Sequence, residues 1–497
     1  MASFSHGVYT QESATSLLAT TEVLSAVPFV VGIAPVNLAT RPAVNTPVLC
    51  YSQAGAVEAF GLEQAIAGAD GLKHFRFSLS EFIYSTFNLY GQTPVVLVNV
   101  LDPAKHVKTA TTNSVTLDSK GTATIAERGL VLSTLSIART DGTADTWVQD
   151  QDYTAVFDDD GFLVVSSLSN DDGLIMPTGE ALTVTAQVLD PSAVTASDII
   201  GGIDAATGAK KGLELISEVY PRFGIIPTMV VCPGFSSQAD VAAVMATKAL
   251  KINTLFDAMA LVDLPATANS KYSDVPSVKT GSNLIDANMI VGWPLVNMGG
   301  TVYHMSTALA GVLARNDANN DGVPYNSPSN KSVEATGLCL EDGSEVVLGN
   351  EEANYLNGEG ITTCLNFGSS GWRIWGNRTA AYPASTDVKD MMIPVRRMFQ
   401  YVSNTIITSI WQRVDDPGNR RLIDSIVDSL NVWLNSLVSR QYLLDGARVE
   451  FRQDENSDAD LMNGKYTFKV YLTPPSPAEQ LLFNLEIDVS AYQSLFN

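Results

Sequence analysis

Cysteine is scarce in this 497-residue chain, and its four copies lie far apart. They are Cys50, Cys232, Cys339 and Cys364, and no two of them form a CxxC pair. This spacing argues against a disulfide framework and against a zinc site. Cys232 lies in an apolar run, which predicts a buried free thiol and is consistent with assembly in a reducing cytoplasm.

Basic residues are also few, because 30 Lys and Arg stand against 53 Asp and Glu, for a net charge of -23. This balance argues against direct binding of nucleic acid, since phosphate neutralisation needs clustered Lys and Arg. The first 370 residues hold 38 acidic and 17 basic side chains, whereas residues 371–497 hold 15 and 13. The nearly neutral C-terminal part can therefore face a partner without strong repulsion.

Long apolar runs are missing as well. No run approaches the ~20 residues that a membrane-spanning helix needs. The best candidate, residues 27–36, is short and contains Pro28 and Pro35. A secretory signal is not predicted, because residues 1–9 lack basic side chains followed by an apolar core. We expect the excess apolar surface to lie in subunit interfaces.

Short runs rich in β-branched residues alternate with helical patterns in residues 28–101 and 193–370. The runs 46–51 and 93–101 flank helical segments, which is βαβ patterning and predicts an α/β domain. Further buried strands are predicted at 224–232, 255–264 and 289–293. One helix is expected to start at a capping box formed by Ser237 and Asp240. The residues of this helix expected to point inward are Val241, Val244, Met245 and Ile252. Another helix is expected over residues 302–315, with Val302, Met305, Leu309 and Val312 pointing inward.

Residues 102–192 have a different texture, in which Thr-rich alternation is interrupted by Gly and Asp turns. One such turn is Asp158-Asp159-Asp160-Gly161. The pattern predicts a small all-β domain that is inserted into the α/β domain and ends near Asp190-Pro191. The three consecutive carboxylates fit a solvated turn better than a metal site.

In the C-terminal part of the chain, a long helical pattern begins after Asp416-Pro417-Gly418-Asn419. Its apolar positions recur at about four residues, which predicts a helix of roughly 20 residues that Gly446 ends. These positions are Leu422, Ile426, Leu430, Trp433 and Leu437. Two strands are then predicted, over residues 447–453 and 465–473.

The last strand pattern covers residues 480–489, behind the break Pro474-Pro475-Ser476-Pro477. Its apolar positions alternate on one face and are Leu481, Phe483, Leu485, Ile487 and Val489. A proline-rich hinge disfavours a tight hairpin, so a strand from this segment could add to another molecule. It could equally complete the sheet of its own domain, and the periodicity alone does not separate these alternatives.

Several motifs resemble, in order and spacing, those of contractile tail sheath proteins. The C-terminal ones are Arg396-Arg397-Met398-Phe399, Asp416-Pro417-Gly418-Asn419, Leu444-Asp445-Gly446, Asn463-Gly464-Lys465 and the stretch from Pro474 to Gln480. Gly371-Trp372-Arg373-Ile374-Trp375-Gly376 with Arg378-Thr379 is the most specific internal motif, where Arg378 is expected to tie loop carbonyls across the domain junction. Gly201-Gly202, Pro233-Gly234 and Asp263-Leu264-Pro265 resemble the central α/β domain of that family, and Gly7-Val8-Tyr9 with Glu12 resembles its opening.

The resemblance implies a multidomain α/β and α+β protein. Its parts would be an N-terminal arm for strand exchange (1–27), a subtilisin-like α/β core (28–101 plus 193–370), an inserted β domain (102–192) and a C-terminal sheath domain with a terminal exchange strand (371–497). It implies a structural subunit of the virion tail sheath, assembled in the host cytoplasm as stacked hexameric rings around an inner tube. Tail tube, baseplate and tail terminator proteins would be its partners, without membrane insertion or direct nucleic-acid contact.

The resemblance also assigns roles to individual residues. Val8 and Tyr9 of the arm, and Leu481, Phe483, Leu485, Ile487 and Val489 of the terminal strand, would bind neighbouring subunits. Arg420 and Arg421, at the start of the second C-terminal helix, are our candidates for facing the tube. No catalytic, cofactor-binding or metal-ligating residue is expected, because the sequence contains no phosphate loop, dinucleotide fingerprint or metal-ligand cluster.

Two chemical alternatives rest on single motifs. His304 lies near Ser306, but no Gly-flanked nucleophilic Ser resembles a protease signature, so an active hydrolase is not expected. Asp317-Ala318-Asn319-Asn320-Asp321-Gly322 opens like a calcium loop, yet its twelfth position is Pro328 instead of Glu. The main functional alternative is a secreted surface-array or adhesion-type structural protein, which fits the acidic composition and the β domain but would need a secretion signal.

Overall fold

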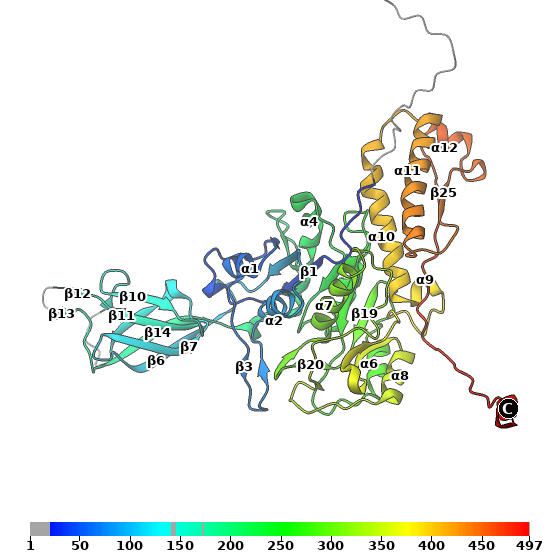
Figure 1. Cartoon of the computed structure of the whole chain (residues 1–497). Coiled ribbons are helices and arrows are strands. Elements are labelled where there is room, and N and C mark those ends of the chain that lie inside the picture. Colours follow the sequence, from blue (N-terminus) through cyan, green and yellow to red (C-terminus); the bar gives the residue numbers. More distant parts are fainter. Residues whose placement is uncertain (1–19, 141–145, 171–172, 497) are drawn as a thin grey trace, which may run out of the picture.

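The computed structural model describes residues 20–140, 146–170 and 173–496 (Figure 1). It is a mixed α/β protein built around an eight-stranded sheet of order β2-β5-β1-β17-β18-β19-β23-β24. The six inner strands are parallel, and β2 and β24 pair antiparallel at the two edges. In sheet order the strands are Val48–Cys50, Val95–Asn99, Pro28–Gly32, Met229–Val231, Met259–Asp263, Met289–Gly292, Ile361–Asn366 and Trp372–Trp375.

Strands β1, β5 and β18 are buried along their whole length, which explains their continuous apolar sequences. Helices α5 (Ala239–Ala249) and α7 (Met305–Ala318) contact β17 and β18. Twelve of the fourteen residues of α7 are buried, as expected of a helix that is apolar on most of its surface. The other helices of this part are α1 (Gln53–Phe60), α2 (Ser78–Tyr84), α3 (Ala196–Ile200), α4 (Ile216–Phe223), α6 (Val275–Gly281) and α8 (Asn350–Gly358).

A five-stranded sheet of order β22-β20-β21-β4-β3 lies beside the main sheet. Its strands are Gly337–Cys339, Leu295–Met298, Thr301–Tyr303, Lys73–His74 and Ile66–Ala67. The pair β15 (Gly202–Ile203) and β16 (Lys210–Lys211) forms a separate small hairpin.

Several local predictions for this part are wrong in detail. The run 46–51 forms β2, but it pairs antiparallel with β5, so it is not the first strand of a parallel βαβ unit. Helix α5 has Gln238 as its N-cap without a side-chain bond, so the capping box at Ser237 and Asp240 is not formed, and Ile252 lies beyond the helix end. Val302 belongs to β21, and α7 begins three residues later.

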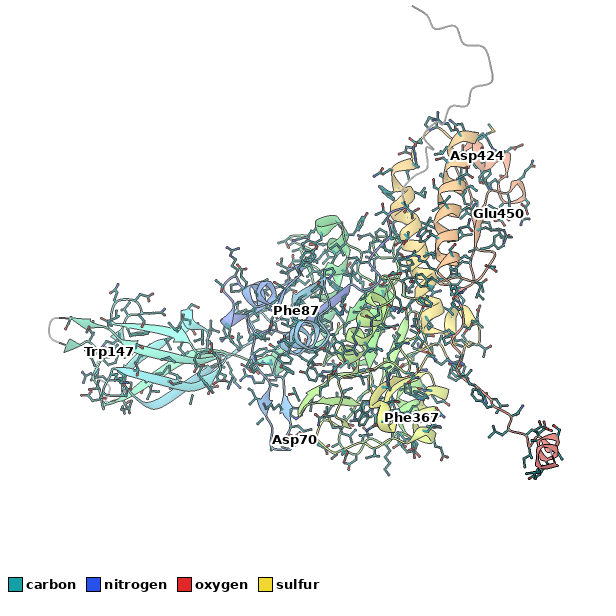
Figure 2. All side chains as sticks on the ribbon, in the orientation of Figure 1. Asp70, Phe87, Trp147, Phe367, Asp424 and Glu450 are labelled. Atoms are coloured by element: carbon teal, nitrogen blue, oxygen red, sulfur yellow. The ribbon has the colours of Figure 1, made fainter. Side chains whose placement is uncertain are left out.

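The described residues between 107 and 189 form their own sheets and their own hydrophobic core, which includes Ile125, Tyr153 and Leu163. One sheet has the order β6-β14-β8-β9 and the other β10-β11-β7, with the pair β12-β13 beside them. In chain order, β6 to β14 are Val107–Thr116, Thr122–Arg128, Ser136–Arg139, Thr146–Trp147, Tyr153–Phe157, Phe162–Ser167, Ser169–Asn170, Gly173–Leu174 and Ala181–Leu189. This part projects away from the rest of the molecule, so that Trp147 lies far from Asp424 at the opposite end (Figure 2).

The C-terminal part contains the long helices α10 (Ile393–Ile410) and α11 (Arg420–Ser439) with the short α9 (Val388–Met391) and α12 (Asp458–Met462). The predicted helix after residue 419 is confirmed, and the Asn419 side chain caps it by accepting from Leu422 N–H at 3.0 Å. Its end was predicted wrongly, because the helix stops at Ser439 and not at Gly446. The chain reverses there through Gln441, whose φ is 62°.

The two strands predicted after this helix exist but are shorter. They are β25 (Arg448–Glu450) and β26 (Lys469–Tyr471), and they pair antiparallel. α11 packs against β25, and the apolar face of the helix contributes Ile426, Leu430 and Trp433 to a separate hydrophobic core.

Candidate assembly surfaces

The C-terminal segment, residues 474–496, leaves the body of the molecule without a strand partner (Figure 1). The strand predicted over residues 480–489 is not formed in the single chain, because residues 480–488 have no regular structure and the 3-10 helix η9 (Val489–Phe496) follows them. Its five alternating apolar side chains are highly exposed: Leu481 by 72%, Phe483 by 79%, Leu485 by 97%, Ile487 by 77% and Val489 by 73%. Within the described residues, the sheet that precedes this segment in the chain contains only β25 and β26. The alternative that this segment completes its own domain's sheet is therefore wrong for the single chain.

The β25–β26 sheet has one edge that α11 covers and one edge, that of β26, on which no strand of the described residues pairs. The Asn431 side chain of α11 binds both backbone groups of Val449, accepting from its N–H at 2.7 Å and donating to its C=O at 3.1 Å. Val449 faces Val470 across the antiparallel pair. Because Val449 directs both groups away from β26, Val470 must direct its own N–H and C=O away from β25. The outer edge of β26 at Val470 is thus able to accept another strand.

The N-terminal residues that the structure describes are attached to the C-terminal helices. Thr21 N–H donates to Ser409 Oγ at 2.9 Å, and Trp433 Nε1 donates to Glu22 Oε1 at 3.0 Å. Val8 and Tyr9 lie outside the described residues. Residues 20–27, the last part of the predicted arm, are therefore fixed to the C-terminal helices of the same chain.

A buried ion pair lies where residues 20–27, α7 and α10 meet. Arg397 donates to both carboxylate oxygens of Asp317, at 2.9 and 2.5 Å, and to the carbonyl of Ser25 at 3.2 Å. Ser25 Oγ donates to the same carboxylate at 2.8 Å. The side chains of Arg397 and Asp317 are only 3% and 2% exposed. Asp317, the first residue of the calcium-like loop, is therefore engaged by a guanidinium.

Arg420 and Arg421 lie at the start of α11, both exposed, and Arg420 Nε pairs with Asp424 at 2.8 Å. Asp424 marks this end of the helix pair in Figure 2. Trp411 and Val414, in the connection between α10 and α11, are 57% and 60% exposed. Sequence reasoning missed these two residues, since an exposed apolar side chain in a loop has no periodicity to reveal it.

The motif around Trp375 lies on the edge strand β24 and the loop after it. The Arg378 guanidinium lies 4.7 Å from the centre of the Tyr382 ring and pairs with the carboxylate of Glu479 in the C-terminal segment. The prediction that Arg378 ties loop carbonyls is wrong, because its partners are this carboxylate and the sulfur of Met391. Beside this pair lies a polar hollow of about 770 Å³.

His304 and Ser306 do not form a catalytic pair in the described structure. His304 Nδ1 lies 2.8 Å from Glu81 Oε2, while the buried Ser306 Oγ donates to Asp263 at 2.5 Å. Burial lowers the pKa of His304, but the nearby charges of Glu81 and Asp263 outweigh it and raise the value to about 9. A protonated imidazole cannot accept the proton of a serine nucleophile.

All four cysteines are buried and free, as predicted for Cys232. In the part of the chain that the structure describes, no group of three or more His, Cys, Asp or Glu side chains is placed to hold a metal ion. Of the helices among these residues, none has both the length and the apolarity needed to cross a membrane.

Comparison with known proteins separates the two structural interpretations of the sequence. No family model matches the chain. The tail sheath protein of Burkholderia phage BcepMu is 29% identical over 98% of this chain and 97% of its own length. A putative prophage major tail sheath protein of Pseudomonas aeruginosa is 28% identical over 59% of this chain and 72% of its own length.

Solved structures with a similar fold span nearly the whole chain. The sheath complex of the extracellular contractile injection system PVC, in its contracted state, has a TM-score of 0.59 with 15% identity, covering 99% of both chains. The contracted helical sheath of the anti-feeding prophage has a TM-score of 0.54 with 17% identity, covering 97% of this chain and 99% of the other. The chain is a homologue of phage tail sheath proteins with the fold of contractile injection system sheaths, and this interpretation is supported over that of a surface-array protein.

Proposed function

We propose that this chain is the structural, non-enzymatic subunit of a contractile tail sheath, which polymerises around an inner tube and contracts to drive the tube through the host cell envelope. The observation that carries the proposal is the exposure of the apolar side chains of the C-terminal segment. This segment exposes five alternating apolar side chains, a pattern that is typical of a strand that adds to another chain. The sheath names of the relatives support the same assembly.

The open edge of β26 is the proposed acceptor for that segment from a neighbouring subunit. A two-stranded sheet is marginal by itself, and an added strand would extend it. Val470 offers the unpaired backbone groups, while Asn431 occupies the outer groups of Val449 and so directs the incoming strand to the β26 side. Residues Leu481, Phe483, Leu485, Ile487 and Val489 would supply one face of that strand, and Val8 and Tyr9 of the arm would bind a second neighbour.

Contraction needs rigid parts joined by segments that change direction. We propose the divisions 28–101 plus 193–370 for a subtilisin-like core, 102–192 for the inserted β domain and 371–497 for the C-terminal domain. Because residues 20–27 are attached to α10 and α11, they would not be part of the movable arm that the sequence predicted over residues 1–27. The second movable segment, predicted from sequence as residues 473–477, would begin after Pro474, because Thr473 C=O accepts from Leu444 N–H and Pro474 is buried.

The tip of the α10–α11 hairpin is the proposed tube contact. Arg420 and Arg421 supply positive charge in an otherwise acidic protein, and Trp411 and Val414 add exposed apolar surface beside them. Such a mixture of an aromatic anchor and Arg is typical of protein interfaces. The remaining partners would be baseplate and tail terminator proteins at the two ends of a stack of hexameric rings, in a particle assembled in the host cytoplasm.

Negative-stain electron microscopy of the purified chain, alone and co-expressed with its tube protein, tests the proposal. Tubes or stacked rings are expected, and deletion of residues 480–497 should abolish them. Deletion of residues 490–497 alone is the matched control, because it keeps all five alternating apolar residues. Flat two-dimensional arrays, or polymerisation that survives the longer deletion, would contradict the proposal.

A further inference from the structure

The path of the C-terminal segment is set at two points. The chain leaves β26 and passes Pro474, which is buried against the body. It next pairs with the body through Glu479, whose carboxylate accepts from Arg378 Nη2. Beyond Glu479 the side chains are exposed, and Leu481 and Leu482 are 72% and 77% exposed. Glu479 therefore marks the place where the segment departs from its own subunit.

Between these two points the linker borders a hollow. Residues 475–480 form one wall of the polar space of about 770 Å³, and Ser327, Asn330, Asn354 and Trp375 are among the residues of the opposite wall. The linker is thus not packed along its length. A segment that is attached at its two ends and borders an open space can be released without exposing a hydrophobic core.

The Arg378–Glu479 ion pair, which holds the end of the linker at Glu479, can open readily. The side chains of Arg378 and Glu479 are 17% and 34% exposed, so solvent and salt reach the pair. The Tyr382 ring at 4.7 Å keeps the guanidinium in place whether or not Glu479 is bound. The body's half of the contact is therefore preformed, and only the linker has to move.

We propose that Arg378 and Glu479 form a clamp that shortens the free length of the C-terminal linker, residues 475–479, until the ion pair opens. With the clamp closed, the donated segment departs from Glu479; with it open, the segment departs from Pro474. The freed chain of about five residues adds at most ~18 Å to the span between subunits. Resting on the proposed function, the inference adds that a sheath subunit lengthens its connection by opening this pair while the donated strand stays bound to its neighbour.

Spin-label distance measurements on the monomeric full-length chain test the clamp directly. Labels are placed on Leu482→Cys and Asn350→Cys, both at exposed positions, whereas the four native cysteines are buried and unreactive. Glu479→Gln is expected to widen the distance distribution about 1.6-fold. The reason is that the tether to residue 482 grows from about three residues to about eight, and the end-to-end distance scales with the square root of length.

Matched variants make the result specific. The charge exchange Arg378→Glu with Glu479→Arg should restore the narrow distribution, and Glu486→Gln, beyond the label, should leave it unchanged. Salt of about 1 M should widen the wild-type distribution toward that of Glu479→Gln. Equal widths for the wild type and Glu479→Gln, or no restoration by the charge exchange, would overturn the clamp. Because monomers are measured, a failure to form tubes would count against the proposed function alone.

Discussion

Arg397 and Asp317 are 80 positions apart in the chain and form a bidentate ion pair that is almost completely buried, with Nη2–Oδ2 at 2.5 Å. The pair joins α10 to the end of α7, and Ser25 adds residues 20–27 to the same contact. A neighbour that pulls on the arm would therefore load the junction between the core and the C-terminal helices.

Replacing Arg397 by Met should destabilise the chain strongly, because it leaves the Asp317 carboxylate buried without its cation. We expect a loss of about 3–5 kcal/mol in the free energy of unfolding. Urea denaturation followed by tryptophan fluorescence measures it. Arg420→Met is the control, since its ion pair is exposed and should contribute less than about 1 kcal/mol. Similar losses for both variants would show that the buried pair has no special role.

His304 should make stability depend on pH in a defined window. Its pKa is raised to about 9 in the folded protein, above the ordinary value of 6.5. The ion pair with Glu81 therefore contributes fully below pH 6.5, and its contribution is lost as the pH rises through 9. The difference in unfolding free energy between the wild type and His304→Gln should shrink across this window. A difference that is constant from pH 6 to pH 10 would contradict the assignment.

Lys279 should act in the opposite direction. Burial lowers its pKa from 10.5 to about 8, and its Nζ donates to the carbonyls of Glu359 and Tyr382 at 2.6 and 2.7 Å. Between pH 8 and 10.5 the unfolded chain binds the proton that the folded chain has lost, so stability from this group rises with pH. Denaturation over this pH range should show that the unfolding free energy of the wild type rises with pH relative to that of Lys279→Met. Parallel curves would mean that the lysine titrates normally.

Gly311 permits the close approach of α7 to Tyr90. A Cβ at this position would lie 2.3 Å from the Tyr90 ring, far inside normal contact. Gly311→Ala should therefore cost about 1–3 kcal/mol in spite of the better helix propensity of Ala. Gly358→Ala, in helix α8 with open space around the new methyl group, should be neutral or stabilising. Thermal unfolding of both variants checks the contrast, and a neutral Gly311→Ala would contradict the packing.

Local patterns accounted for the elements that are defined by neighbours in the chain. The stripe from Leu422 to Leu437 predicted α11, and alternation predicted the strands that contain Val449 and Val470. The same reasoning failed at boundaries. Gly446 did not end α11, because the reversal at Gln441 is made by contacts with the preceding turn, in which Tyr442 N–H donates to Leu437 C=O at 2.9 Å.

The features proposed for assembly also fall into two groups, those that the sequence determined and those that the tertiary structure decided. The sequence by itself determined the apolar face of the terminal segment, the proline-rich linker before it and the acidic surface of the first 370 residues, since each is a property of composition or of a short repeat. Only the tertiary structure decided which edge of the β25–β26 sheet is open, which carboxylate Arg397 meets and where Glu479 is held. These contacts join residues 18 to 101 positions apart, and no periodicity encodes a pairing that depends on how separately folded elements pack.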